Sequence, residues 1–96
     1  MKKIAIITGA TSGIGRATAL LLAKNGYDII ATGRREQRLD QLKKDLLSNN
    51  VEADFLSLNF DIRKLQEVKA AVNKLKGKWK NIDVLVNNAG LSAGLN

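Results

Sequence analysis

The residues with the clearest capacity for chemistry form a glycine-rich turn near the start of the chain. Gly9, Gly13 and Gly15 follow the spacing G-x-x-x-G-x-G, directly after the apolar run at residues 4–7. A strand that leads through such a turn into a helix can bind the pyrophosphate of a dinucleotide, because the helix amino end attracts phosphate. The candidate contacts are Gly9, Ala10, Thr11, Ser12, Gly13, Ile14 and Gly15.

The glycine turn also has a simpler interpretation, as a tight strand-to-helix connection without a ligand. Glycine adopts positive φ without steric cost, lets a ligand approach the backbone, and lets a helix pack closely on a strand. The spacing also differs from the G-x-G-x-x-G of the general dinucleotide motif. The turn alone therefore leaves both interpretations open.

The amino-acid composition excludes several classes of chemistry. The 96 residues contain no cysteine and no histidine. Without cysteine there is no disulfide, thiolate metal site or cysteine nucleophile. Without histidine there is no Ser-His-Asp triad, and the commonest metal ligand is missing. We therefore predict one small domain without a metal site.

No part of the sequence predicts a membrane or export segment. No apolar run approaches the roughly 20 residues that span a bilayer. The basic start, Met1-Lys2-Lys3, is followed by an apolar run that ends at Thr8, which is too short for the core of a signal peptide. We expect a cytoplasmic protein with no membrane partner.

The net charge of +7 has three interpretations. The lysines can be solvated on helix faces, they can attract a phosphate-bearing small ligand, or they can bind a nucleic acid through counterion release. They are spread over several segments, from Lys43 to Lys80, and aromatic residues make up only 4% of the chain. Because no stacking platform accompanies the charge, we expect no nucleic-acid partner.

Apolar periodicity predicts strands that alternate with helices. We expect strands at residues 2–8, 27–32, 51–58 and 82–86, and helices at residues 13–25, 36–48 and 63–76. The helices carry apolar stripes, which are Ile14, Ala17 and Leu21, then Leu39, Leu42 and Leu46 facing inward, then Leu65, Val68, Val72 and Leu75. The βαβαβαβ order predicts an α/β fold, a Rossmann-like doubly wound parallel sheet with strand order 3-2-1-4, which is incomplete.

In such a sheet the ligand crevice lies where the winding reverses, between the first and fourth strands. Four segments would reach the carboxyl edge of the sheet, namely residues 9–15, 33–35, 61–62 and 87–90. All four carry residue types expected of a nucleotide site. This agreement supports a nucleotide ligand more strongly than any one motif.

These motifs resemble the short-chain dehydrogenase/reductase family of the classical type, in its N-terminal cofactor-binding half. Thr8-Gly9-xxx-Gly13-x-Gly15 is similar to the family's glycine motif, and Asn87-Asn88-Ala89-Gly90 to its second signature. Residues 81–91 with Gly33-Arg34-Arg35 look most like the subgroup of NADP-dependent dehydrogenases that oxidise 3-hydroxy acids such as serine and allo-threonine. A sugar-nucleotide epimerase or an extended-type reductase usually has another glycine spacing and lacks Asn-Asn-Ala-Gly.

The resemblance implies further cofactor contacts. Asp61 and Ile62 stand where the family has an Asp-Val pair that contacts adenine. Asn88, Ala89 and Gly90 should lie near the nicotinamide-side ribose, whereas Asn87 braces the sheet. Asp61 has a second, compatible interpretation as the N-cap of the third predicted helix.

The corner after the second predicted strand indicates which dinucleotide binds. It reads Thr32-Gly33-Arg34-Arg35 and contains no acid before Glu36. A carboxylate there would bond the ribose 2′-hydroxyl of NAD and repel a 2′-phosphate, whereas two guanidiniums offer donors to that phosphate. We predict NADP over NAD. The alternative is that Arg34 and Arg35 are simply solvated.

The resemblance also implies the activity, which is hydride transfer between NADP and a hydroxyl or carbonyl substrate, with a 3-hydroxy acid as a candidate. In the family a tyrosine and a lysine four residues later exchange a proton with the substrate, and a serine positions its oxygen. Here Tyr27 is followed by Ala31 at that spacing, and Ser92 lies too close to the second signature. We assign no catalytic residue within this chain.

We therefore expect residues 1–96 to be the cofactor-binding part of a single domain in a longer, homo-oligomeric oxidoreductase. The fourth strand would then be an open edge, and the third helix would cover only part of one sheet face, which leaves an apolar patch. The alternative is a stand-alone, non-catalytic nucleotide-binding module.

Overall fold

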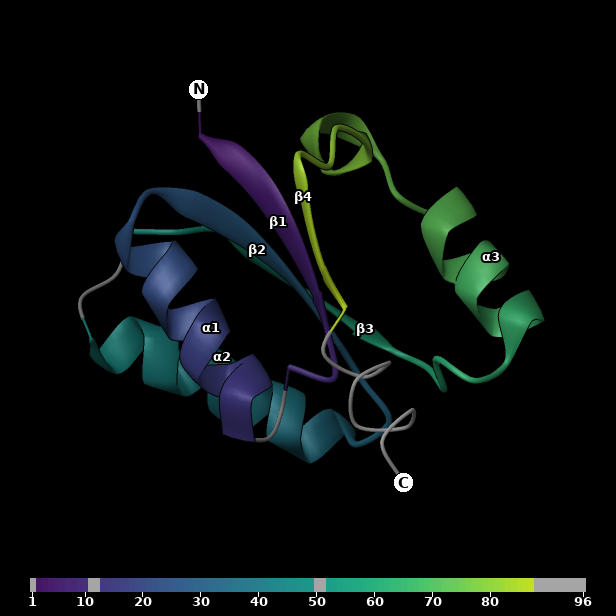
Figure 1. Ribbon diagram of the computed structural model, residues 1–96, viewed down its shortest axis with the longest axis horizontal. Helices are drawn as coiled ribbons and strands as arrows, with labels where there is room; N and C mark the ends of the chain where they lie inside the picture. The colour runs from purple at the N-terminus through teal and green to yellow at the C-terminus, as the bar shows by residue number, and fades with distance from the viewer. Residues whose placement is uncertain (1, 11–12, 50–51, 88–96) are drawn as a thin grey trace.

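Strand β1 (Lys3–Thr8) lies inside a parallel sheet whose strand order is β3-β2-β1-β4. The computed structural model describes residues 2–10, 13–49 and 52–87. The other elements are α1 (Gly13–Lys24), β2 (Tyr27–Gly33), α2 (Glu36–Ser48), β3 (Phe55–Asn59), α3 (Leu65–Asn73), the 3-10 helix η1 (Gly77–Lys80) and β4 (Val84–Asn87). Figure 1 shows α1 and α2 on one side of the sheet and α3 on the other. The predicted α/β class and strand order are confirmed.

Strands β1 and β2 are buried on both faces of the sheet. Every residue from 4 to 8 and from 28 to 32 is buried. Continuous apolar runs of this kind are typical of central parallel strands that have other layers above and below them. The register places Ile7 opposite Ala31 of β2, and Thr8 opposite Asn87 of β4.

Helices α1 and α2 build the main core on one face of the sheet. The inward stripe of α2 is confirmed, because Leu39, Leu42 and Leu46 are almost completely buried. Helix α1 instead packs through small residues, of which Ala19 and Ala23 belong to the same core cluster. Small side chains let the helix axis approach the strands closely.

The apolar stripe predicted on α1 has the expected spacing but does not pack against the sheet. Ile14 is 76% exposed and Leu21 is 62% exposed, and Ala17 is also exposed. The small residues Gly15, Ala19 and Ala23 occupy the buried face of this helix instead. The side chains of α1 that join the core are therefore the small ones, Ala19 and Ala23, and not the larger apolar ones.

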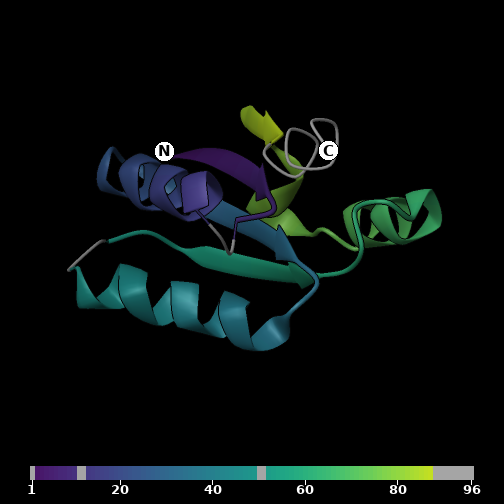
Figure 2. The ribbon, with the colours of Figure 1, turned by 60° about the horizontal axis from the view of Figure 1, so that its bottom comes forward.

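The opposite face of the sheet is only partly covered, as predicted, but α3 is not what covers it. Within the described residues α3 has no buried side chain, and Leu65 is 65% exposed. The helix lies beside the sheet, away from α1 and α2 (Figures 1 and 2). The covering side chains, Leu75, Trp79 and Ile82, come from the segment after it and contact Ile4, Ile6 and Ile30.

The largest differences from the sequence-based bounds are in α3, β3 and β4, of which β4 begins at Val84 rather than at residue 82. Helix α3 spans Leu65–Asn73 rather than residues 63–76, because the chain then turns to bury Leu75 and enters η1 through Gly77 at φ 61°. Strand β3 begins at Phe55, whereas its start was expected at residue 51, outside the described residues. Just before β3, the Asp54 N–H donates to Asp28 Oδ1 at 2.8 Å. The Asp28 side chain therefore accepts this hydrogen bond in place of a backbone carbonyl of the neighbouring strand.

A charged cluster closes the amino-terminal edge of the sheet. Lys78 Nζ lies 3.1 Å from Oδ2 of the buried Asp28 and also pairs with Asp54. Nearby, the Ile4 N–H donates to Asp83 Oδ2 at 2.8 Å. A pocket of about 540 Å³ lies between these groups.

None of the helices in the described part of the chain is both long and apolar enough to cross a membrane.

Candidate functional site

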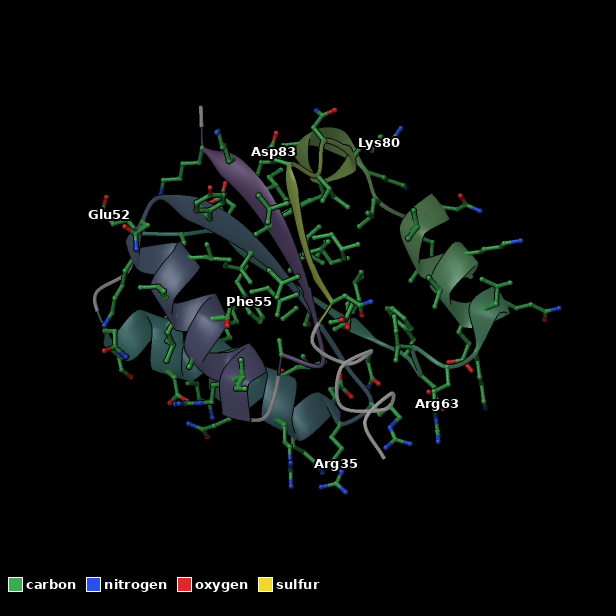
Figure 3. All side chains as sticks on the ribbon, viewed as in Figure 1. Arg35, Glu52, Phe55, Arg63, Lys80 and Asp83 are labelled. Carbon is green, nitrogen blue, oxygen red and sulfur yellow. The ribbon has the colours of Figure 1, made fainter. Side chains whose placement is uncertain are left out.

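The carboxyl ends of the parallel strands meet at one edge of the sheet, opposite the edge that carries Asp83. Gly9 follows β1, Gly33 ends β2, Asp61 follows β3, and Asn87 ends β4. Figure 3 shows Arg35 and Arg63 at this end of the molecule and Asp83 at the other. Because the winding reverses between β1 and β4, this edge is where doubly wound sheets bind ligands.

The glycine turn after β1 has the backbone geometry that its sequence predicts. Gly9 has φ 63° and Gly13 has φ 47°, conformations that side chains other than glycine rarely adopt. The N–H of Ala10 donates to the Thr32 carbonyl at 3.2 Å, which ties the turn to the end of β2. Helix α1 begins at Gly13, so its amino end and the positive end of its dipole lie at this edge.

The other residues predicted in the turn differ in their exposure to solvent. Ile14 is exposed, whereas Gly15 is buried, which is compatible with a glycine that permits close helix–strand packing. Thr11 and Ser12 lie outside the described residues.

The ends of β1 and β4 are joined by side chains. The Thr8 hydroxyl lies 3.3 Å from the Val86 carbonyl oxygen and 3.3 Å from Asn87 Oδ1, and it donates to this pair of acceptors. The contact agrees with the prediction that Asn87 braces the sheet. The predicted ribose contacts Asn88, Ala89 and Gly90 lie outside the described residues.

The corner after β2 presents two cations to solvent. Arg34 and Arg35 are both exposed. The carbonyl of Arg35 accepts the first helical hydrogen bonds of α2, from the N–H groups of Arg38 and Leu39. Among the described residues no carboxylate lies within 4.0 Å of either guanidinium. Both guanidiniums are therefore available to an anion.

The loop after β3 is held firmly beside this corner. The Phe60 N–H donates to the Gly33 carbonyl at 3.1 Å. The Asp61 N–H donates to Glu67 Oε1 of α3 at 3.2 Å. The loop is therefore attached both to the end of β2 and to the first turn of α3. Ile62, the second predicted adenine contact, is half-buried in this loop.

The Asp61 carboxylate forms a bidentate pair with Arg63. Its Oδ1 accepts from the Arg63 N–H at 3.0 Å and from Nε at 3.1 Å, and its Oδ2 lies 3.0 Å from Nη2. The interpretation of Asp61 as an N-cap is wrong, because α3 begins at Leu65 and Lys64 precedes it without a side-chain cap. Asp61 instead closes a tight turn onto the residue two positions later.

The pair determines the charge state of both groups. The hydrogen bonds from the Arg63 side chain and backbone, with a smaller effect of the positive charge of Arg34, lower the pKa of Asp61 to about 2. The same hydrogen bond raises the pKa of Arg63. Asp61 is therefore an ionised acceptor at any physiological pH. Sequence reasoning missed Arg63, although the Asp-x-Arg spacing is compatible with this turn.

Taken together, the edge offers a helix amino end, backbone N–H groups, the fixed carboxylate of Asp61, and two guanidiniums without an ion-pair partner among the described residues. This set can bind an anionic nucleotide and orient it by its two ends. Within the described residues no group of three His, Cys, Asp or Glu side chains could hold a metal ion. Trp79 packs against the core.

Comparison with known proteins gives the family. The model of the short chain dehydrogenase family matches residues 3–96. This chain belongs to the short-chain dehydrogenase family. The resemblance drawn from the glycine turn and the Asn-Asn-Ala-Gly motif is thereby confirmed.

The relatives include dehydrogenases of the subgroup that the sequence resembles. The chain is 45% identical over 92 residues to an NADP-dependent 3-hydroxy acid dehydrogenase of Salmonella typhi, covering 96% of this chain and 35% of that protein. It is 45% identical over 89 residues to the serine 3-dehydrogenase of Rhizobium radiobacter, covering 93% and 34%. The chain thus spans about a third of the length of these relatives.

The fold matches solved structures as well. L-sorbose reductase from Gluconobacter frateurii, solved with NADPH and L-sorbose, aligns with a TM-score of 0.83 at 35% identity. The alignment covers 93% of this chain and 34% of the reductase.

Proposed function

We propose that this chain supplies the cofactor site of an NADP-dependent oxidoreductase, which transfers hydride between NADP and a hydroxyl or carbonyl substrate. One observation carries the proposal: in a member of this family, the positive-φ glycine turn lies at the same edge of the sheet as Arg34 and Arg35, which have no ion-pair partner in the described part of the chain. Family membership also favours an oxidoreductase over a non-catalytic nucleotide-binding module.

The proposed contacts follow the strands. The glycine turn binds the pyrophosphate, the arginine corner binds the 2′-phosphate, the loop after β3 faces the adenine, and the segment after β4 faces the nicotinamide-side ribose. The residues, in that order, are Gly9, Ala10, Thr11, Ser12, Gly13, Ile14 and Gly15; Arg34 and Arg35; Asp61 and Ile62; and Asn88, Ala89 and Gly90.

The residues of this edge fit NADP chemically. The two guanidiniums have no carboxylate partner among the described residues, so they can donate to a phosphate without breaking an ion pair. The amino end of α1 favours the pyrophosphate charge. When bound, NADP supplies the hydride acceptor or donor, and the residues of this chain bind and orient it.

We further propose a 3-hydroxy acid as the substrate, since two relatives are named for such substrates. The proton-transferring residues would then belong to a part of the protein beyond residues 1–96, which together with this part forms one Rossmann-like domain. The lengths of the relatives support this arrangement. We propose that the protein is cytoplasmic and that it forms a homo-oligomer. Size-exclusion chromatography of the full-length protein would test the oligomeric state.

The test is a comparison of NADPH and NADH affinities in the full-length protein. We expect wild type to bind NADPH more tightly, and Arg34→Ala to weaken NADPH by about tenfold or more while NADH changes little, because a charge-assisted hydrogen bond is lost. Lys43→Ala, an exposed charge removed from α2, is the control. Equal affinities of wild type for the two cofactors would contradict the NADP assignment.

A further inference from the structure

The Asp61–Arg63 pair lies at the same edge as the arginine corner and has a fixed geometry. Both carboxylate oxygens accept hydrogen bonds from the Arg63 side chain, at 3.1 Å from Nε and 3.0 Å from Nη2. The side chain of Asp61 is only 14% exposed, whereas that of Arg63 is 65% exposed. A bidentate guanidinium restricts a carboxylate in both position and orientation.

The surrounding hydrogen bonds prevent the pair from moving away from the corner. The Phe60 N–H donates to the carbonyl of Gly33, the residue just before Arg34. On the other side, Glu67 accepts from the Asp61 N–H at 3.2 Å and lies 3.5 Å from Lys64 Nζ. The carboxylate is thus held near the guanidinium of Arg34, whose charge also lowers the pKa of Asp61.

This geometry creates an electrostatic problem for a cofactor with a 2′-phosphate. An ionised carboxylate beside the arginine corner would repel that phosphate, in the same way that an acid at the end of β2 selects against it. The guanidinium of Arg63 carries the opposite charge and lies directly on the carboxylate, so the pair together has no net charge. The Arg63 guanidinium is already hydrogen-bonded to Asp61. It therefore affects binding of the 2′-phosphate by neutralising Asp61, and not by contacting the phosphate.

We propose that Arg63 is a specificity-determining residue for NADP, which acts by neutralising and orienting the Asp61 carboxylate. The inference rests on the proposed function, since it assumes that the arginine corner receives the 2′-phosphate. Arg63 is a positioning residue here, and Arg34 and Arg35 remain the phosphate donors.

The experiment measures dissociation constants for NADPH and NADH with the full-length protein, by nicotinamide fluorescence. Arg63→Ala should weaken NADPH binding by about tenfold and NADH binding by less than about threefold, because only the former carries the repelled phosphate. Adding salt should reduce the NADPH loss, since screening weakens the repulsion. Arg63→Lys, which keeps the charge, should restore most of the NADPH affinity.

A double variant separates this effect from loop damage. Asp61→Asn/Arg63→Ala removes both charges of a pair that has no net charge, so its NADPH affinity should lie within about threefold of that of wild type. Lys64→Ala is the matched control, because it removes a neighbouring cation whose partner is Glu67 rather than Asp61. It should leave the ratio of the two cofactor affinities unchanged.

Three outcomes would overturn the inference while leaving the proposed function intact. These are an unchanged NADPH affinity in Arg63→Ala, an equal loss for both cofactors, and a double variant as weak as Arg63→Ala. If instead wild type shows no preference for NADPH, the proposed function fails first, and the inference falls with it.

Discussion

Lys78 Nζ lies 3.1 Å from Asp28 Oδ2, although the two residues are 50 positions apart in the sequence. Asp28 is a buried residue of β2, and the same ammonium group also pairs with Asp54, just before β3. The hydrogen bonds that Lys78 donates to Asp54 and to Asp28 raise the pKa of Lys78. The cluster therefore ties η1, and the chain that leads into β4, to the amino-terminal edge of the sheet.

Removal of the Lys78 ammonium should destabilise the fold. Lys78→Met leaves the buried Asp28 carboxylate without its cation, so the urea midpoint of unfolding should fall clearly below that of wild type. Lys80→Met removes an exposed cation from the same 3-10 helix and should leave the midpoint nearly unchanged. Asp28→Asn/Lys78→Met should recover part of the loss. Equal midpoints for the two single variants would contradict this role.

Leu42, on the inward stripe of α2, should contribute much more to stability than Leu47, which is exposed on the same helix. Leu42 is 1% exposed and Leu47 is 62% exposed on the same helix. Leu42→Ala should lower the free energy of unfolding by about 2–5 kcal/mol, because it removes buried methyl groups and leaves a cavity. Leu47→Ala should cost less than about 1 kcal/mol. Urea unfolding of the two variants gives the comparison, and similar losses would mean that the helix packs differently.

The turn before α1 should resist any side chain because of its backbone conformation. A Cβ at Gly13 would meet no atom within 4 Å, but the residue has φ 47°. Gly13→Ala should therefore destabilise by about 1–2 kcal/mol, and Gly13→Asn by less, since asparagine tolerates this conformation better. Urea unfolding measures the cost. A neutral Gly13→Ala variant would show that the turn relaxes to negative φ.

The Asp61–Arg63 pair should make stability depend on acid pH. The pKa of Asp61 is lowered from 3.8 to about 2 in the folded state. Its stabilising contribution is therefore complete above about pH 3.8 and is lost as the pH falls toward 2. Over this window the free energy of unfolding of wild type should fall more steeply than that of Asp61→Asn, which has no carboxylate to protonate.

The comparison with Asp61→Asn is needed because other carboxylates titrate in the same range. The pKa of Asp45 is lowered by the hydrogen bond from Arg16, and the pKa of Asp54 by the hydrogen bond from Lys78. Both contributions remain in the variant, so they cancel in the difference. Chemical denaturation across this pH range measures that difference, and parallel curves would contradict a stabilising role of the pair.

The sequence by itself determined the order of elements, the strand order and the family. The apolar run at residues 4–7 and the stripe of Leu39, Leu42 and Leu46 are local patterns. The continuous run indicates a strand buried on both faces, and the helical spacing of the stripe indicates which face of α2 is buried. The role of the glycines in the turn could also be predicted, because the positive φ at Gly9 and Gly13 is a local requirement of the backbone.

Only the tertiary structure decided which side chains meet across the fold. The buried face of α1 is its small-residue face, because the distance between helix and sheet, rather than hydrophobicity, selects Ala19 and Ala23 over Ile14 and Leu21. The pairing of Lys78 with Asp28 depends on contacts between distant segments. The position of Asp61, bound by Arg63 and not capping α3, likewise depends on where the helix begins once the loop is tied to Gly33.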